Sequence, residues 1–406
     1  MTYKELKSNW IVMSTNVFID IIDDFLMLVY NTISGVYKIS TDADFITLVR
    51  GLYTPKNLGV LDSSILLSYM SDDIEWAIHE KVIVPTNVED KPIVMLPILN
   101  LQKDVSKFGN DNIEDRLSII GSKQSLISGI YIRISQICDC EQNEIHDYRR
   151  IASLQYPCPS YCGSRASIGS DTLSKILDSL KYTSVSLVDI IFDSSYFDEN
   201  SIDDFINDLS CHNYKYRLHF YAEDIDTALL LREKVKKNSI QLITYIDKFT
   251  KKTTLNKLTS VDKVKRLVYE GIEETECIQS LPVYIGEIQA QSFPKKCVSE
   301  EGVIEPKLKF INVFRNMKLN SNFFGIFDIT PTCDIHAHGS QHIIGNLQLD
   351  NFSWTNMVVR ELQQNNSWRL TRDMTSCKCC PFRYLCPPIS SYEIASNNTQ
   401  ICKTTL

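Results

Sequence analysis

The sequence lacks a long hydrophobic run: no stretch in its 406 residues approaches the roughly 18 consecutive apolar positions of a membrane-spanning helix. Residues 1–14 also lack the long apolar core and the small-residue cleavage site of a secretory signal. Basic residues are in the minority, because 42 Lys and Arg face 50 Asp and Glu for a net charge of −8. Such an acidic chain is a poor binder of nucleic acid or anionic membrane, so we expect a cytoplasmic protein with neither partner.

What the chain does contain is the balance of an ordinary globular protein, with 44% hydrophobic and 23% charged residues. This balance excludes a disordered chain. We find no internal repeat and no low-complexity tract. Because the length exceeds the roughly 100–200 residues of one domain, we expect three regions, at 1–100, 101–300 and 301–406.

The region 1–100 begins with three short runs of apolar and β-branched residues, at 17–22, 25–30 and 36–39. Polar residues separate the runs, which predicts a small antiparallel meander. Two sets with helical spacing follow: Phe45, Leu48, Val49 and Leu52, then Ile74, Ala77, Ile78 and Val82. Apolar residues at such intervals are typical of the buried face of a helix. The pattern predicts a compact, winged-helix-like α+β unit.

The region 101–300 alternates between strand-like and helix-like patterns. Strands are expected at 129–135, 186–192, 216–221, 239–246 and 281–288. Helices are expected at 173–180, 202–209, 226–236 and 260–276. This alternation predicts an α/β fold with a parallel sheet, open or closed into a partial (β/α) barrel. Functional groups of such a fold lie at the C-terminal ends of the strands. The region 301–406 is less regular and rich in cysteine.

The C-terminal region carries the clearest metal-ligand spacing among the 13 cysteines. Clustered cysteines in a reducing compartment indicate metal or cofactor ligation more often than disulfides. Cys377, Cys380, Cys386 and Cys402 are candidate ligands, because thiolates at short spacing can reach one soft metal centre. An iron–sulfur cluster ([4Fe–4S]) and zinc both remain open. The alternative is a set of buried structural cysteines.

Two further groups could bind a metal. The first comprises Cys138, Cys140, Cys158 and Cys162. These form either one four-cysteine site or a set of free thiols, and the sequence does not decide their role. The second comprises Cys333, His336 and His338. Its alternative is a polar loop that leads into a turn.

The spacing of the C-terminal cysteines, with Ile329-Thr-Pro331 and Ile344-Gly-Asn-Leu347 upstream, resembles the SPASM domain. That domain is the auxiliary iron–sulfur module of radical SAM peptide-modifying enzymes. The alternating segment before it is similar to the partial barrel of these enzymes. The N-terminal unit resembles the RiPP recognition element, which holds the leader of a ribosomally synthesised, modified peptide (RiPP). The chain as a whole most resembles the pseudo-radical-SAM proteins found beside genuine radical SAM/SPASM maturases in Bacteroidetes peptide clusters.

The departures from the family affect two parts of its SAM site. The family's C-x3-C-x2-C motif corresponds to Cys158-Pro-Ser-Tyr-Cys162-Gly-Ser-Arg165, in which arginine, which cannot ligate iron, takes the place of the third cysteine. The family's glycine-rich segment corresponds to Asp193-Ser-Ser-Tyr-Phe197, which has no glycine. The resemblance therefore implies a pseudoenzyme without catalytic residues, and SAM is not expected as a cofactor.

The resemblance also implies partners, namely a precursor peptide and a radical SAM/SPASM maturase. The expected peptide-binding residues are Val36, Tyr37, Lys38 and Ile39, an edge strand with the helix at 74–82 as the opposite wall. Two alternatives remain open. One is a radical SAM peptide-modifying enzyme with an atypical iron–sulfur cluster, and the other is a zinc-stabilised interaction protein.

Overall fold

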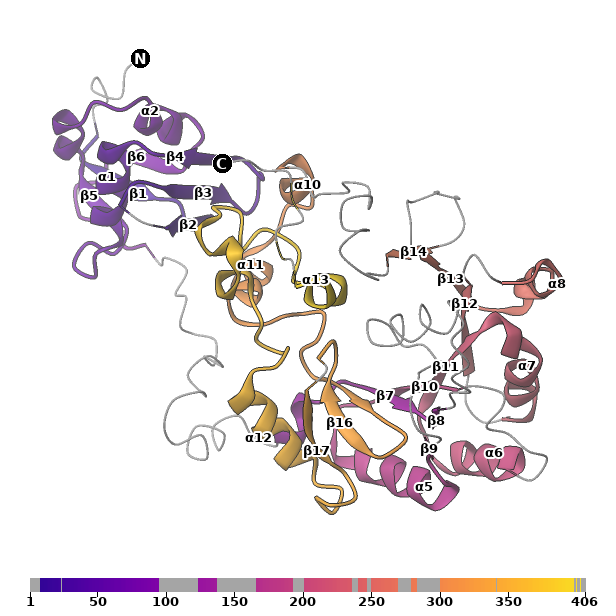
Figure 1. Ribbon diagram of the computed structural model, residues 1–406. Helices are drawn as coiled ribbons and strands as arrows, with labels where there is room; N and C mark the ends of the chain where they lie inside the picture. The colour runs from indigo at the N-terminus through magenta and orange to yellow at the C-terminus, as the bar shows by residue number, and fades with distance from the viewer. Residues whose placement is uncertain are drawn as a thin grey trace.

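The computed structural model describes residues 8–22, 24–94, 123–136, 166–192, 201–235, 240–246, 250–268, 279–282, 300–340, 342–397, 399 and 402. Figure 1 shows an N-terminal unit, a curved sheet flanked by helices, and C-terminal elements that contact both. No helix within the described ranges is long and apolar enough to cross a membrane.

The N-terminal unit combines two three-stranded antiparallel sheets with two helices. Its elements are β1 (Trp10–Met13), β2 (Val17–Ile21), β3 (Met27–Asn31), β4 (Tyr37–Ser40), α1 (Ala43–Tyr53), β5 (Val60–Asp62), α2 (Asp72–His79) and β6 (Ile83–Thr86). The expected meander is confirmed, since β2, β3 and β4 pair in that order. The second sheet, in the order β5-β1-β6, joins strands far apart in the sequence and was not expected.

Local sequence explains where the helices of this unit begin. The Asp42 side chain accepts a hydrogen bond from the backbone N–H of Phe45 at 2.7 Å, and the Ser71 hydroxyl caps α2 through the N–H of Ile74. Such caps satisfy backbone donors that the first turn leaves unpaired. The apolar faces of both helices are buried against the two sheets, as the helical spacing predicts.

The central region is built on a nine-stranded sheet, in the order β14-β13-β12-β11-β10-β7-β15-β16-β17. Its central strands are β7 (Gly129–Arg133), β10 (Leu187–Ile191), β11 (Lys215–Tyr221), β12 (Ile240–Ile246), β13 (Lys263–Val268) and β14 (Gln279–Pro282). These six strands are parallel and sequential. The expected α/β class with a parallel sheet is therefore confirmed. A short pair, β8 (Ser135–Gln136) and β9 (Ala166–Ser167), follows β7.

One expected element of this region is wrong in its described part. The sequence predicts a helix over 260–276, but residues 263–268 form β13, parallel to both β12 and β14, and residues 269–276 lie outside the described residues. Val261, Val264 and Val268 have helical spacing, yet the same stretch also alternates Lys263, Val264 and Lys265. Pairing with two neighbouring strands decides between these two local readings.

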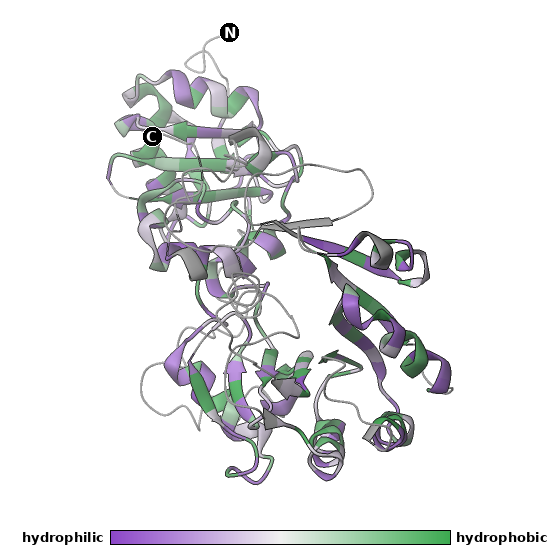
Figure 2. Cartoon of the chain, turned by 45° about the vertical axis from the view of Figure 1, so that its right-hand side comes forward, coloured by the Kyte–Doolittle hydropathy of each residue, from purple (hydrophilic) through white to green (hydrophobic). Residues whose placement is uncertain are grey.

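Helices cover one face of the large sheet. They are α5 (Ser170–Ser179), α6 (Ser201–Cys211), α7 (Ile225–Lys234) and the short α8 (Lys252–Leu255). The apolar residues of α5, α6 and α7 form one core with alternate strand residues such as Ile132, Ile190 and Leu218. Figure 2 shows these helices with hydrophobic and hydrophilic stretches intermixed, as amphipathic helices require. The remaining strand residues point to the opposite face, called the inner face below.

The C-terminal elements extend this sheet. They are α10 (Glu300–Ile304), α11 (Phe310–Lys318), β15 (Ile326–Ile329), β16 (Asp334–Ala337), β17 (Ile343–Asn346), α12 (Trp354–Gln364) and α13 (Ser391–Ser396). Strand β15 pairs in parallel with β7, and β16 and β17 follow as an antiparallel hairpin. A side chain at Gly325 (φ +79°) would lie 2.4 Å from the Leu126 carbonyl, so this junction requires glycine.

A separate core joins the C-terminal region to the N-terminal unit. Phe18, Leu28 and Tyr30 of the meander pack against α10, α11 and the segment 382–385. Arg383 donates to the Asp20 carboxylate at 2.9 Å, and both side chains are largely buried. Figure 1 shows the indigo N-terminal strands beside these orange and yellow elements. The region 301–406 therefore contributes to two cores, one shared with the large sheet and its helices and one with the N-terminal unit.

Candidate functional site

The expected peptide-binding strand lies at an edge of the meander. Residues 37–40 form β4, which pairs with β3 only, among the described strands, and Val36 directly precedes it. The backbone N–H of Asn31 donates to Val36 at 2.8 Å, which sets the alternation of hydrogen-bonded pairs. Lys38 and Ser40 therefore bond to β3, whereas the N–H and C=O groups of Tyr37 and Ile39 point away from the sheet.

One side of this edge is formed by α2. The Lys38 ammonium lies 2.6 Å from the Asp73 carboxylate and 5.3 Å from the centroid of the Trp76 ring. The Ser40 hydroxyl donates to the same carboxylate. These contacts hold α2 beside β4; the helix expected at 74–82 ends at His79, so Val82 lies beyond it. A peptide at this edge would meet an indole ring and a neutralised ion pair.

The other side of the edge is formed by the C-terminal region. Tyr37 makes an edge-to-face contact with Phe382, with ring centroids 5.8 Å apart. Ile39 packs against the same core. The four expected peptide-binding residues are all half-buried, so their side chains stiffen the strand at this edge of the sheet.

A comparable edge in the same unit is blocked by proline. Strand β6 lies at an edge of the β5-β1-β6 sheet and contains Pro85. The N–H of Ser14 donates to the Val82 carbonyl, and the register then places Pro85 in a non-hydrogen-bonded pair with Ile11. The missing N–H of Pro85 therefore falls on the outer side of β6. Proline at an edge prevents strand addition, and β4 has none.

The candidate metal ligands lie at the C-terminal end of the chain. Cys377 is buried, and Cys380, Cys386 and Cys402 are half-buried. Burial raises the pKa of Cys386 to about 12 and also raises the pKa of Cys380, with smaller contributions from the other thiols of the set. The Arg372 guanidinium opposes both shifts. The four thiols are therefore close enough to affect one another.

This proximity does not by itself make a metal centre. The Cys377 thiol donates to the Thr399 carbonyl, with 3.4 Å between sulfur and oxygen. Within the described parts of the chain, no three His, Cys, Asp or Glu side chains converge as a metal site requires. A thiol with a raised pKa binds metal only by releasing its proton. Ligation by Cys377, Cys380, Cys386 and Cys402 stays a prediction.

The structure does not bring Cys333, His336 and His338 together as one site. Cys333 is 2% exposed and packs into the core of the large sheet, as do Ile335 and Ala337. His336 alternates with Ile335 and Ala337 along β16, and His338 donates to Asp328. The structure therefore does not bring Cys333 together with the two histidines, and ligation by any one of them stays a prediction.

Two sequence features lie outside the described residues. One is the cysteine group of Cys138, Cys140, Cys158 and Cys162, which includes the altered SAM motif. The other is the segment 193–197.

The structure also brings together polar residues that the sequence did not single out. Arg217 donates to both oxygens of Asp189, with Nη2 at 2.6 Å, and His219 Nε2 donates to the same carboxylate at 2.7 Å. The Tyr245 hydroxyl is 3.0 Å from His219 Nδ1 and acts as the donor, because the other ring nitrogen carries the proton. These residues come from β10, β11 and β12 and line the inner face.

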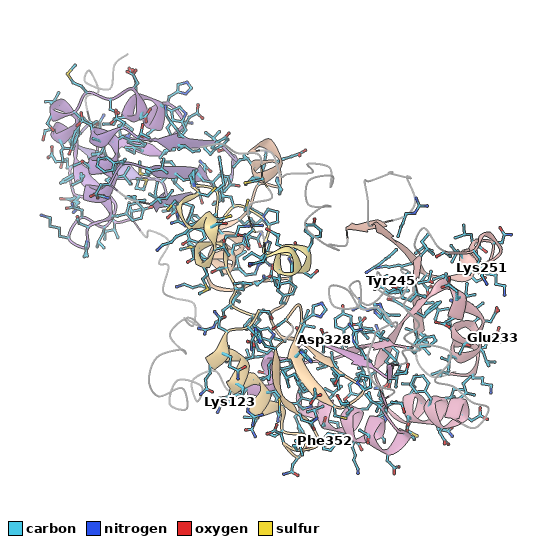
Figure 3. All side chains as sticks on the ribbon, viewed as in Figure 1. Lys123, Glu233, Tyr245, Lys251, Asp328 and Phe352 are labelled. Carbon is cyan, nitrogen blue, oxygen red and sulfur yellow. The ribbon has the colours of Figure 1, made fainter. Side chains whose placement is uncertain are left out.

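A second carboxylate–histidine pair lies beside the first. His338 donates to Asp328 at 2.8 Å, and the Tyr131 ring stacks on His338 at 4.6 Å and lies 5.7 Å from His219. Figure 3 labels Asp328 on β15 and Tyr245 on β12. The polar residues at alternate positions of β11, Arg217 and His219, were the available signal, because a fully buried strand would be apolar at both faces.

The described geometry provides three features: an open strand edge, a set of thiols and a polar inner face. No protein-family model matches the chain. No curated protein matches it either. Among solved structures, the crystal structure of methylornithine synthase (PylB) is similar at 10% identity with a TM-score of 0.20. That match covers 44% of this chain and 60% of the methylornithine synthase chain, less than two thirds of its length. So low a TM-score supports no conclusion about function.

Proposed function

We propose that the chain is a non-catalytic accessory protein in RiPP maturation, which binds an extended segment of a precursor peptide at β4 and assists a partner radical SAM/SPASM maturase. The observation that carries this proposal is the β4 edge. This edge strand pairs with β3 only, among the described strands, turns the N–H and C=O groups of Tyr37 and Ile39 away from β3, and lies between α2 and Phe382. Strand addition uses such groups for affinity and adjacent side chains for selectivity.

The magnitudes fit a selective but moderate binder. Each backbone hydrogen bond contributes about 0.5–1.5 kcal/mol net, so two donors and two acceptors contribute about 2–6 kcal/mol before the peptide's ordering cost. Side-chain contacts must supply the remainder. Trp76 and Tyr37 flank the edge and provide aromatic surface for alternate residues of the bound strand.

The order of elements in the N-terminal unit supports the same proposal. The meander of β2, β3 and β4 precedes the helices, and α2 lies beside β4, in the arrangement that the resemblance to a RiPP recognition element implies. Phe382 of the SPASM-like C-terminal region packs against the face of the meander that carries Leu28 and Tyr30. A peptide at β4 is therefore bound beside both the C-terminal region and the N-terminal helices.

Isothermal titration calorimetry of the full chain with the cognate precursor peptide tests the binding step. We expect a one-to-one complex that Ile39→Pro weakens at least tenfold, because proline removes an outward N–H while the bonds to β3 come from Lys38 and Ser40. Ile39→Val keeps the N–H and most of the packing, and is expected to change affinity less than twofold. Circular dichroism checks that both variants fold. No binding by the unaltered chain, alone or with its maturase, would refute the proposal.

The non-catalytic part of the proposal has a separate test. After anaerobic reconstitution with iron and sulfide, the chain is incubated with SAM and reductant and assayed for deoxyadenosine. We expect none above the background of a Cys158→Ala variant. Deoxyadenosine formation that depends on Cys158 would establish instead a radical SAM enzyme with an atypical cluster.

Metal analysis of the anaerobically purified chain tests the remaining alternative. Stoichiometric zinc without iron or sulfide favours the zinc-stabilised interaction protein.

A further inference from the structure

The inner face of the large sheet has a charge distribution that peptide binding at β4 does not use. Asp189 is 2% exposed, and its carboxylate is fully engaged by the bidentate Arg217 and by His219. These contacts hold the pKa of Asp189 below its usual value against the effect of burial. Burial lowers the pKa of His219, so that this imidazole is neutral. Asp189 and Arg217 therefore cancel one another, and this part of the face has no net charge.

Lys265 on β13 lies beside this neutral group and has no such compensation. Its ammonium lies 5.8 Å from the centroid of the Tyr245 ring, and it makes no ion pair or hydrogen bond to any described residue. Lys263, two positions earlier in the same strand, points to the same face. The charged groups that influence Lys265 are Arg217, Lys263 and Asp189, and the two cations together with burial lower its pKa.

A half-buried ammonium group is costly unless an anion compensates it. We propose that the inner face binds a carboxylate group of a ligand at Lys265, beside the Tyr245 ring. The site is distinct from the β4 edge, since it lies on another sheet and uses side chains rather than backbone. The proposed carboxylate site does not depend on peptide binding at β4.

The chemistry favours a carboxylate over a phosphate. The Arg217 guanidinium, whose planar fork binds carboxylate and phosphate alike, is already occupied by Asp189. The remaining half-buried cation is the Lys265 ammonium, since Lys263 is exposed, and one half-buried positive charge matches the single negative charge of a carboxylate. Aromatic surface next to it, from Tyr245 and the neighbouring Tyr221, suits the carbon portion of the ligand. The carboxylate could belong to an acidic side chain of a peptide or to a small organic acid.

Nuclear magnetic resonance of the full chain with 13C-dimethylated lysines tests this inference. Three probes are titrated: propionate, the capped tripeptide acetyl-Ala-Glu-Ala-amide, and inorganic phosphate. Lys265→Arg assigns the signal. We expect the Lys265 signal to shift saturably with a carboxylate and its pKa to rise, because a bound carboxylate favours the charged ammonium. Acetyl-Ala-Gln-Ala-amide, which lacks the carboxylate, should give no shift.

The probes distinguish the source of the carboxylate. Tighter binding of the glutamate tripeptide than of propionate identifies a peptide ligand, and the reverse identifies a small acid; either result supports the site. Lys265→Met should abolish the shift of the neighbouring Lys263 signal and weaken binding at least tenfold, whereas Lys263→Met should weaken it less than threefold. An unresponsive Lys265 signal, or phosphate binding as tight as that of propionate, would overturn the proposal. The Ile39→Pro variant should bind the carboxylate unchanged, which separates this outcome from that at β4.

Discussion

The meander of the N-terminal unit and the large sheet differ in what their faces leave available. Both faces of the meander are apolar and covered: Val29 and Met27 point to α1 and α2, and Leu28 and Tyr30 point to the C-terminal region. The large sheet has one apolar face under its helices and one polar inner face. A sheet buried on both faces can bind a partner only through its edge.

This difference separates two kinds of recognition. Backbone groups at β4 recognise any extended chain, and selectivity must come from the flanking Trp76 and Tyr37. Side chains on the inner face recognise charge and shape, with little use of the backbone, because every central strand is paired on both sides. Perturbations should therefore affect the two regions differently.

The largest expected effect comes from uncovering one face of the meander. Phe382 is 1% exposed and contacts Tyr37, so Phe382→Ala should cost about 3–5 kcal/mol through lost burial and the cavity left behind. Differential scanning calorimetry should show a lower Tm for the transition that involves the N-terminal unit, and weaker peptide binding. Met374→Ala, at an exposed position, is the matched control. Equal Tm values for the two variants would show that this contact does not hold the meander.

A smaller effect is expected when the inner face loses a charge. Asp189→Asn keeps the size of the side chain but removes the carboxylate that neutralises Arg217 and accepts from His219. Charge-assisted hydrogen bonds contribute about 1.5–3 kcal/mol, so we expect a loss of about 2–3 kcal/mol in the free energy of unfolding. Urea denaturation followed by tyrosine fluorescence measures it. Asp178→Asn changes an exposed ion pair with Lys181 and should cost less than about 1 kcal/mol.

The contact between the meander and the C-terminal region should depend on pH. Burial raises the pKa of Asp20 to about 6, and the attraction of Arg383 offsets only part of this effect. Oδ2 of Asp20 has no hydrogen-bond partner among the described residues. Asp20 therefore keeps its proton to higher pH in the folded chain than in the unfolded chain. Its contribution to stability is complete below its unfolded pKa of 3.8 and is lost as pH rises through about 6.

Between pH 5 and 7 this loss amounts to about 1 kcal/mol. Thermal unfolding at the two pH values measures it, with Asp20→Asn as the control. The asparagine variant lacks the titrating group, so its change in Tm between pH 5 and 7 should be smaller. A greater stability of the unaltered chain at pH 7 than at pH 5, relative to this variant, would contradict the direction of the shift.

Local sequence patterns predicted the strands and helices whose structure depends mainly on residues close together in the sequence. The strands of the meander and the helices α1 and α2 follow from spacing within a dozen residues. The sequence predicts a helix where β13 forms because both the helical and the alternating spacing fit 260–268, and only pairing with β12 and β14 decides between them. The sheet β5-β1-β6 was missed for the same reason, because its strands are separated by two helices.

The candidate site was predictable in part. The β4 strand was expected from the resemblance and from the run at 36–39. The effect of Pro85 on β6 was not, because only the pairing of β1 with β6 shows that its missing N–H lies on the outer side of the sheet. The position of Cys333 relative to His336 could not be predicted from strand alternation, because Cys333 has a left-handed backbone (φ +63°) before β16 begins. The row of Asp189, Arg217 and Tyr245 was not predictable, because these residues come from three strands far apart in the sequence.

The smallest expected effect compares the response of the two sites to salt. Raising the sodium chloride concentration from 50 to 500 mM should weaken carboxylate binding at Lys265 about threefold, because the Debye length falls from about 14 Å to about 4 Å and the attraction between single charges is screened. Peptide binding at β4 should change less than about 1.5-fold, since neutral backbone groups supply its hydrogen bonds. Calorimetry with the peptide and chemical-shift titration with propionate measure the two constants. A stronger salt dependence at β4 than at Lys265 would mean that charged side chains, rather than the strand edge, determine peptide affinity.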